Sequence, residues 1–189
     1  MEMFEYVAVL TSIIAGLGIA NLLQGLARLI QHPGQDRVYW VHLGWVLYTF
    51  LYVVHWWWFE FRLGSIEVWT IQLYWFLVMY AVTLYLECAL LFPASLADYD
   101  GFREYFYSRR GWFFGLWALI GALDVGDSWL KGGEHLSSLG SNYLVGQGIF
   151  LALFLVAART RNERFHAALV IACVANLTLW ALTSYETVL

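Results

Sequence analysis

The stretch FEYVAVLTSIIAGLGIANLLQGLARLI, residues 4–30, decides the class of this protein. It holds one acidic residue near its start, Glu5, and one basic residue near its end, Arg28. A helix needs about 20 mostly apolar residues to cross the roughly 30 Å hydrocarbon core of a bilayer, because each residue rises about 1.5 Å. The stretch therefore predicts a transmembrane helix.

Further apolar segments follow along the 189-residue chain. The expected spans are residues 4–30, 38–61, 68–92, 112–129, 142–158 and 165–185. None shows the sustained alternation of apolar and polar residues that is typical of membrane β-strands. The sequence predicts an all-α integral membrane protein, a six-transmembrane-helix bundle forming a single transmembrane domain over residues 1–189, without a soluble domain.

The composition agrees with this class. The chain is 61% hydrophobic and 13% charged, whereas a soluble domain is about 45–50% apolar and about 25% charged. Its net charge of −4 excludes the basic surface that a nucleic-acid partner needs. The chain is rich in tryptophan, with 11 residues, several of them near span ends, where indole rings favour the lipid–water interface. The bilayer is thus the expected partner.

The ten basic residues predict the orientation of the chain. Short cytoplasmic loops of membrane proteins carry the excess of lysine and arginine. With the N-terminus and C-terminus both outside, eight basic residues fall on the cytoplasmic side and two fall outside, which predicts a multi-pass protein of the cell (inner) membrane. The cytoplasmic set is Arg28, Arg37, Arg103, Arg109, Arg110, Arg159, Arg161 and Arg164, and the outer set is Arg62 and Lys131.

Motifs that would indicate an enzyme are missing from the sequence. It contains no phosphate-binding glycine loop, no HExxH and no GxSxG, and no motif of a characterised family. Cys88 and Cys173 are far apart and without metal-ligand spacing. The sequence therefore favours a non-enzymatic role without catalytic residues, metal or cofactor.

Polar residues inside a membrane are costly and often functional. Glu87 lies about five residues, or roughly 8 Å, inside the cytoplasmic end of span 68–92. Asn21, Gln24 and Arg28 of the first span reach the same depth. A Glu87–Arg28 ion pair would either hold the bundle together or belong to a relay for protons or ions.

The outer end is acidic, and Asp124 and Asp127 lie on one helix face because they are three residues apart. A path from these aspartates through His55 and Tyr52 to Glu87 is conceivable. The leading hypothesis is therefore a channel or small transporter that passes a proton or a small cation.

Two alternatives remain open. His42 and His166 both lie near the cytoplasmic surface and could ligate a haem b, which would make this a membrane redox protein. The third hypothesis is a non-transporting scaffold, sensor or membrane-perturbing effector, with the 98–110 loop docking a cytoplasmic partner.

Small residues predict where helices approach closely, because lipid offers no hydrophobic drive between them. Ser12, Gly16 and Ala20 form one stripe of the first span. A second stripe holds Thr11, Ile14, Gly18, Asn21, Gly25 and Arg28. Two such stripes predict a central first helix and favour a homo-oligomer.

Overall fold

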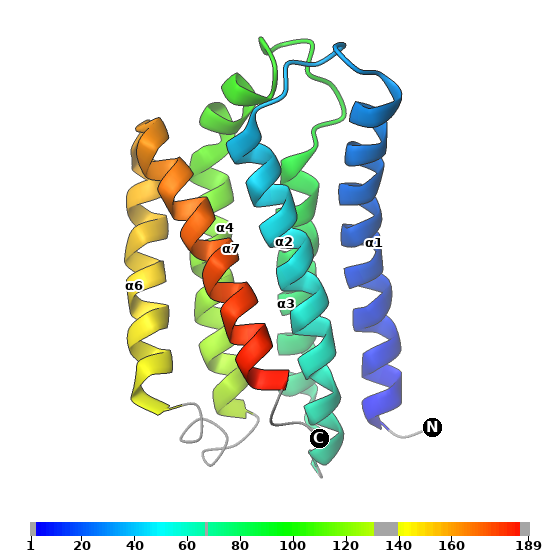
Figure 1. Ribbon diagram of the computed structural model, residues 1–189. Coiled ribbons are helices and arrows are strands. Elements are labelled where there is room, and N and C mark those ends of the chain that lie inside the picture. The colour runs from blue at the N-terminus through cyan, green and yellow to red at the C-terminus, as the bar shows by residue number, and fades with distance from the viewer. Residues whose placement is uncertain (1–2, 67, 131–139, 186–189) are drawn as a thin grey trace.

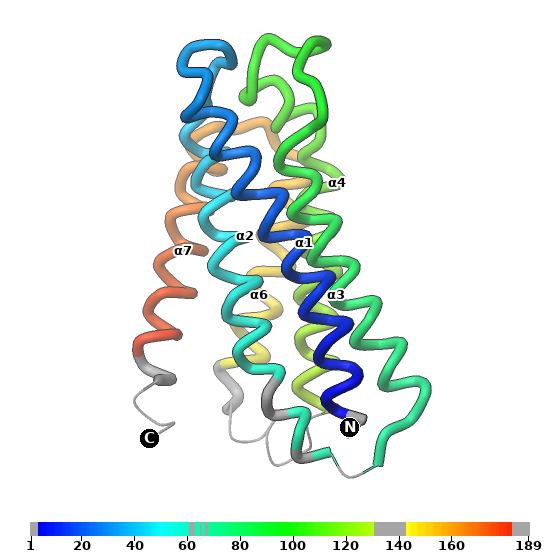
Figure 2. The backbone as a smooth tube through the Cα atoms, turned by 90° about the vertical axis from the view of Figure 1, so that its right-hand side faces the viewer, coloured from blue at the N-terminus to red at the C-terminus, as the bar shows by residue number. Residues whose placement is uncertain are grey.

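The computed structural model describes residues 3–66, 68–130 and 140–185. Within these ranges the chain forms six α-helices, one short 3-10 helix and no strand, so the all-α class is confirmed (Figure 1). The elements are α1 (Met3–Gln31), α2 (Trp40–Phe59), η1 (Glu60–Ser65), α3 (Ile71–Leu91), α4 (Phe102–Leu130), α6 (Gly140–Arg159) and α7 (Glu163–Tyr185). Successive helices run in opposite directions, and α1 begins at the end of the bundle where α7 finishes (Figures 1 and 2).

Four of these helices are long and apolar enough to cross a membrane, namely Phe4–Gln31, Ile71–Leu91, Phe102–Leu130 and Glu163–Leu182. The apolar part of α6, Tyr143–Arg159, is shorter. Helix α2 has 20 residues, but its tryptophans, tyrosines and histidines lower its mean hydropathy. Each expected span overlaps one helix. That all six helices cross a membrane stays a prediction.

Helix α4 begins ten residues earlier than the expected span 112–129. Residues 102–110, which we expected to lie in a loop, form its first turns. Phe102, Tyr105 and Phe106 are buried at helical spacing, whereas Arg103 and Glu104 are exposed between them. Because charges lie on the outer face of this amphipathic segment, the segment is not uniformly apolar and does not resemble a membrane span in the sequence.

Helix α1 lies at the edge of the bundle, so the prediction that it is central was wrong (Figures 1 and 2). It packs along α3, and less along α2. Gly18 and Gly25 of its second stripe permit the close approach, since a Cβ at Gly18 would meet Cys88 Sγ at 3.1 Å. In the first stripe, Ser12 accepts a hydrogen bond from Trp57 Nε1 of α2 over 2.8 Å. Gly16 of the same stripe has no atom within 4 Å of the position that a Cβ would take. Both stripes therefore contribute contacts within the chain, and Gly16 stays open.

The core lies between α2, α3, α4, α6 and α7, and its largest fully buried side chains include Trp45, Trp117, Tyr80 and Phe114. Large apolar side chains also cover the outside of the bundle at mid-height. Examples with about half of their surface exposed are Leu17, Leu47, Met79, Leu119, Ile149 and Ile171. An outer surface of this kind suits lipid better than water.

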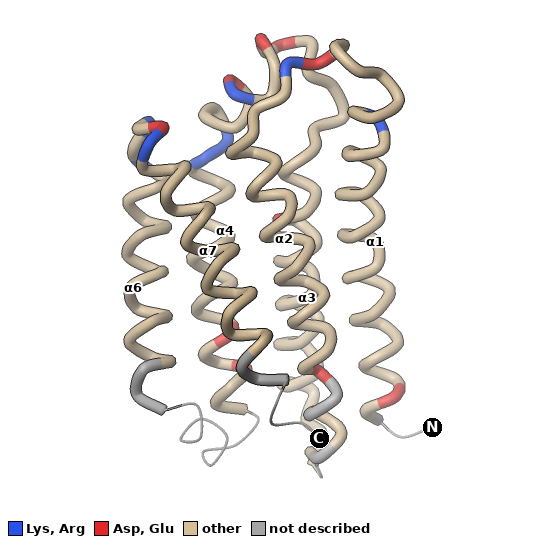
Figure 3. Tube along the Cα trace, in the orientation of Figure 1, with Lys and Arg blue, Asp and Glu red and all other residues tan. Residues whose placement is uncertain are grey.

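The charged side chains divide the bundle into two ends (Figure 3). The basic end carries the α1–α2 and α3–α4 connections and the α6–α7 turn, and all lysines and arginines coloured among the described residues lie there. The opposite, acidic end holds the starts of α1 and α3 and the last turns of α4. Lys131 and the side chain of Arg62 lie outside the described residues.

Candidate functional site

The densest group of polar side chains surrounds Asp124, about two turns before the end of α4. Tyr52 of α2 and Tyr80 of α3 donate hydrogen bonds to Oδ1 over 3.4 and 3.2 Å. Tyr143 and Gln147 of α6 donate to Oδ2, each over 2.7 Å. We call these five residues the Asp124 cage. Three other helices thus direct hydrogen bonds to one carboxylate inside the bundle.

The remaining contacts extend the cage along α4. The hydroxyls of Tyr52 and Tyr80 lie 3.1 Å apart, and Ser128 Oγ lies 3.1 Å from the hydroxyl of Tyr143. Asp127, three residues after Asp124, is also buried. The predicted neighbourhood of Asp124, Asp127 and Tyr52 is therefore present at the acidic end.

An aromatic layer lies on the cage towards the basic end. Tyr48, one turn from Tyr52 on α2, packs on Trp117 with ring centroids 4.7 Å apart. Trp117 also contacts Tyr52 at 5.0 Å and Trp45 at 6.5 Å. Tyr48 also contacts Tyr52, with ring centroids 6.1 Å apart. Tyr48 therefore belongs to the aromatic layer beside the cage.

Glu87 is fully buried on α3, seven residues or roughly 10 Å along the helix from Tyr80. Neither of its carboxyl oxygens has a hydrogen-bond partner among the described residues. Thr49 Oγ1 and the indole nitrogens of Trp45 and Trp117 are likewise buried without such a partner. Buried polar atoms are nearly always hydrogen-bonded, so this group of four side chains is unusual.

The predicted Glu87–Arg28 ion pair is not formed, because no nitrogen of Arg28 lies within 4.0 Å of the Glu87 carboxylate. Arg28 instead lines an open cleft of about 540 Å³ between the α1–α2 and α3–α4 connections. Asn21 Nδ2 donates to the carbonyl of Cys88 over 3.2 Å, and Gln24 is exposed. The pair fails because α1 lies at the edge of the bundle while Glu87 lies inside it.

His55 is half-buried, and its Nδ1 is 2.6 Å from the carbonyl oxygen of Leu51, one turn earlier in α2. Its ring lies against Trp180 of α7, with centroids 6.4 Å apart. Tyr52, the other residue of the predicted path on α2, donates its hydrogen bond to Asp124 Oδ1.

His42 secures the end of α3, where carbonyl groups would otherwise be buried without donors. Its Nε2 is 2.7 Å from the carbonyl oxygen of Leu91. The hydroxyl of Tyr105 donates to the carbonyl of Leu90 over 2.7 Å, and Asn21 supplies the bond to Cys88. Side chains from α1, α2 and α4 therefore cap the last turn of α3.

The haem alternative stays a prediction. His42 stacks on Phe102 at 4.6 Å and meets the edge of Phe92 at 5.4 Å. His166 stacks on Phe114 at 5.3 Å, and its Nε2 is 3.1 Å from the carbonyl oxygen of Thr160. Phenylalanine rings thus pack against both imidazoles, and the Nδ1 atom of each is buried without a hydrogen-bond partner among the described residues.

Sequence reasoning missed most of the Asp124 cage. Tyr143 and Gln147 are four residues apart on one face of α6, a spacing that could have marked them as one polar patch. Tyr48 and Tyr80 carried no such signal, because tyrosine is also common in apolar helices. Comparison of the chain with known protein families, with curated proteins and with solved structures finds no match.

Proposed function

We propose that this chain is a multi-pass protein of the inner membrane that passes a proton or a small cation through its helix bundle. The observation that carries the proposal is the buried carboxyl group of Glu87, which lacks a hydrogen-bond donor among the described residues. An ionised side chain at that depth is costly unless a proton or a cation neutralises it. Transport proteins use intramembrane carboxyl groups in this way.

The membrane placement rests on three features. Four helices are long and apolar enough to cross, the mid-height surface is apolar, and the described basic side chains gather at one end. The excess of arginine at that end supports its assignment to the cytoplasmic side. The acidic end, with Asp124 and Asp127, would then face outward and attract cations.

The proposed path enters at the Asp124 cage and ends at Glu87. Tyrosine hydroxyls can both donate and accept a hydrogen bond. The hydroxyls of Tyr52, Tyr80 and Tyr48 can therefore relay a proton between the carboxyl groups of the cage and of Glu87. Thr49 and the two indole groups add polar atoms beside Tyr48. Such atoms suit internal water molecules, which complete many proton paths.

Self-association is part of the proposal and rests on the outer face of α4. Gly111 and Gly115 are exposed there, and no atom lies within 4 Å of the Cβ that either would gain. Glycines spaced by four residues let two helices approach closely in a membrane. Gly16 on α1 is open in the same way.

The decisive experiment measures flux in proteoliposomes that contain a pH-sensitive dye or a dye for sodium or potassium. We expect the wild-type protein to dissipate an imposed gradient, and Glu87→Gln and Asp124→Asn to lower the flux at least tenfold. Asp98→Asn is the matched control, because Asp98 is an exposed acid at the basic end and should leave the flux unchanged.

If wild-type flux equals that of protein-free liposomes, the transport proposal is wrong and the non-transporting scaffold or sensor becomes the better explanation. In that case Arg103, Glu104 and Arg109, exposed on the first turns of α4, would form the docking surface for a partner.

A further inference from the structure

Besides Arg28, five arginines at the basic end have no carboxylate within 4.0 Å among the described residues. They are Arg109, Arg110, Arg159, Arg161 and Arg164, and we call them the arginine corner. All but Arg110 are exposed. They come from the first half of α4, the end of α6, the α6–α7 turn and the first turn of α7. The sequence places them in two separate segments, and the fold brings the segments together.

Specific contacts hold this corner together. Arg110 Nη2 donates to the backbone carbonyl of Arg159 over 3.5 Å, which joins α4 to the end of α6. Arg103 pairs with Glu163 and so joins α4 to the start of α7. The rings of Tyr107 and His166 pack beneath this pair, with centroids 5.4 Å apart. Arg109 Nη2 donates to the hydroxyl of Tyr99 over 2.9 Å, so the corner borders the α3–α4 connection.

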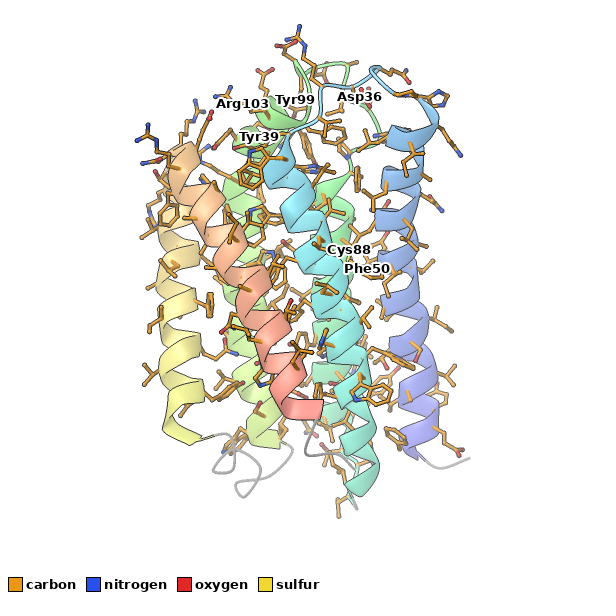
Figure 4. The ribbon with its side chains drawn as sticks, in the orientation of Figure 1. Asp36, Tyr39, Phe50, Cys88, Tyr99 and Arg103 are labelled. Carbon is orange, nitrogen blue, oxygen red and sulfur yellow. The ribbon has the colours of Figure 1, made fainter. Side chains whose placement is uncertain are left out.

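Three acidic residues of the basic end lie on the connections beside α1 and α3, whereas Glu104 lies on α4 and Glu163 lies within the corner, where it pairs with Arg103. Asp36 and Asp98 are in these connections, and Asp100 there pairs with Arg37 over 2.7 Å. In Figure 4 Asp36 lies towards α1, whereas Arg103 lies on the side of α7. The ion pair with Arg103 neutralises Glu163, so the five arginines of the corner keep no carboxylate within 4.0 Å among the described residues. Like charges held close together repel each other, which favours the binding of an anion among them.

We propose that the arginine corner binds the phosphate of anionic phospholipids. The guanidinium group of arginine matches phosphate with two parallel hydrogen bonds. Apolar surface suited to the acyl chains lies directly below. Trp112, 72% exposed, is three residues from Arg109 on α4, and Val156, 52% exposed, is three residues before Arg159 on α6. A phospholipid would contact the arginine corner through its phosphate and the apolar surface through its acyl chains. A soluble anion would contact the arginines alone.

This inference depends on the proposed membrane placement but not on the passage of ions. A juxtamembrane arginine contributes about a fivefold gain in affinity for an anionic lipid surface. Arg161 and Arg164 suit a test best, since both are exposed and neither side chain has a hydrogen bond to the described part of the chain. Their replacement removes charge and leaves the helix packing intact.

The test titrates the detergent-solubilised full chain with phosphatidylglycerol or with phosphatidylcholine and counts bound lipids by native mass spectrometry. We expect phosphatidylglycerol to bind more tightly, Arg161→Gln to weaken it about fivefold and the double variant Arg161→Gln/Arg164→Gln about 25-fold. Arg37→Gln is the matched control, with the same loss of charge at the same end, and should change binding less than twofold. Circular dichroism checks that each variant keeps its helices.

Wild-type protein alone supplies two further readings. Raising the salt concentration should weaken the binding of phosphatidylglycerol and leave that of phosphatidylcholine unchanged. Inorganic phosphate at tenfold excess should not displace the lipid. Equal binding of the two lipids, an equal effect of Arg37→Gln and Arg161→Gln, or displacement by inorganic phosphate would each overturn the proposal. The flux experiment is independent, so either proposal can fail without the other.

Discussion

The contact between Gly25 of α1 and Phe92 at the end of α3 allows one prediction to be worked out in detail. A Cβ added at Gly25 would overlap the ring of Phe92, and even the third-nearest ring atom, Cδ1, would be 2.5 Å away. Carbon atoms prefer a separation of about 3.5–4.0 Å, so helix or ring must move by roughly 1 Å. The ring cannot move freely, because it packs against His42 at 5.4 Å and Phe102 at 5.7 Å.

Gly25→Ala should therefore destabilise the protein through overpacking, which costs about 1–3 kcal/mol in well-packed cores. The same substitution also gains up to about 1 kcal/mol, because alanine favours the helix more than glycine does. Gly16→Ala on the same helix shares this gain, and no atom lies within 4 Å of its added Cβ. The difference in stability between the two variants isolates the packing term, and we expect about 1–3 kcal/mol.

The assay is reversible unfolding of the purified protein in mixed micelles, followed by circular dichroism as the denaturing detergent is increased. Gly25→Ala should unfold at a lower denaturant fraction than wild type, and Gly16→Ala at the same or a higher one. Two variants that agree within about 0.5 kcal/mol would refute the close packing of α1 on α3. Restored stability in Gly25→Ala/Phe92→Leu, relative to Gly25→Ala, would identify the ring as the obstacle.

Two other predictions concern buried hydrogen bonds. His42→Phe keeps most of the ring volume but removes the donor to Leu91, and we expect a loss of about 1–3 kcal/mol in the same unfolding assay, the cost of a buried carbonyl without a partner. A loss below 0.5 kcal/mol would contradict the capping role of His42. Tyr143→Phe removes one hydrogen bond to the Asp124 carboxylate and should cost about 1.5–3 kcal/mol. In Asp124→Asn the further effect of Tyr143→Phe should shrink, which a double-mutant cycle measures, and additive losses would argue against the cage.

The places of the helices could be predicted from the sequence, because an apolar run of sufficient length is a local property. The expected segments 38–61 and 142–158 differ by only a few residues from α2 and α6. The start of α4 could not be predicted this way. Its first turns are buried through Phe102 and Phe106, but exposed charges between them made the segment resemble a loop.

The candidate site was predicted in part. Asp124 and Tyr52 lie together, as expected from their levels on neighbouring helices, and the carboxyl group of Glu87 is buried. The prediction of an ion pair between Glu87 and Arg28 was wrong, because two residues at the same level of the bundle need not lie on helix faces that meet. Arg28 and Glu87 share a level, but α1 contacts the face of α3 that carries Cys88.

The sequence by itself determined the all-α class of the protein, since the length and apolar character of a helical segment are local properties of the chain. Only the tertiary structure decided which polar groups meet. The donors to Asp124 come from three other helices, and the arginine corner joins residues 49 positions apart, Arg110 and Arg159. The physical reason is that helix neighbours are selected by how side chains fit across interfaces. That fit depends on pairs of residues distant in sequence, which no single segment can specify.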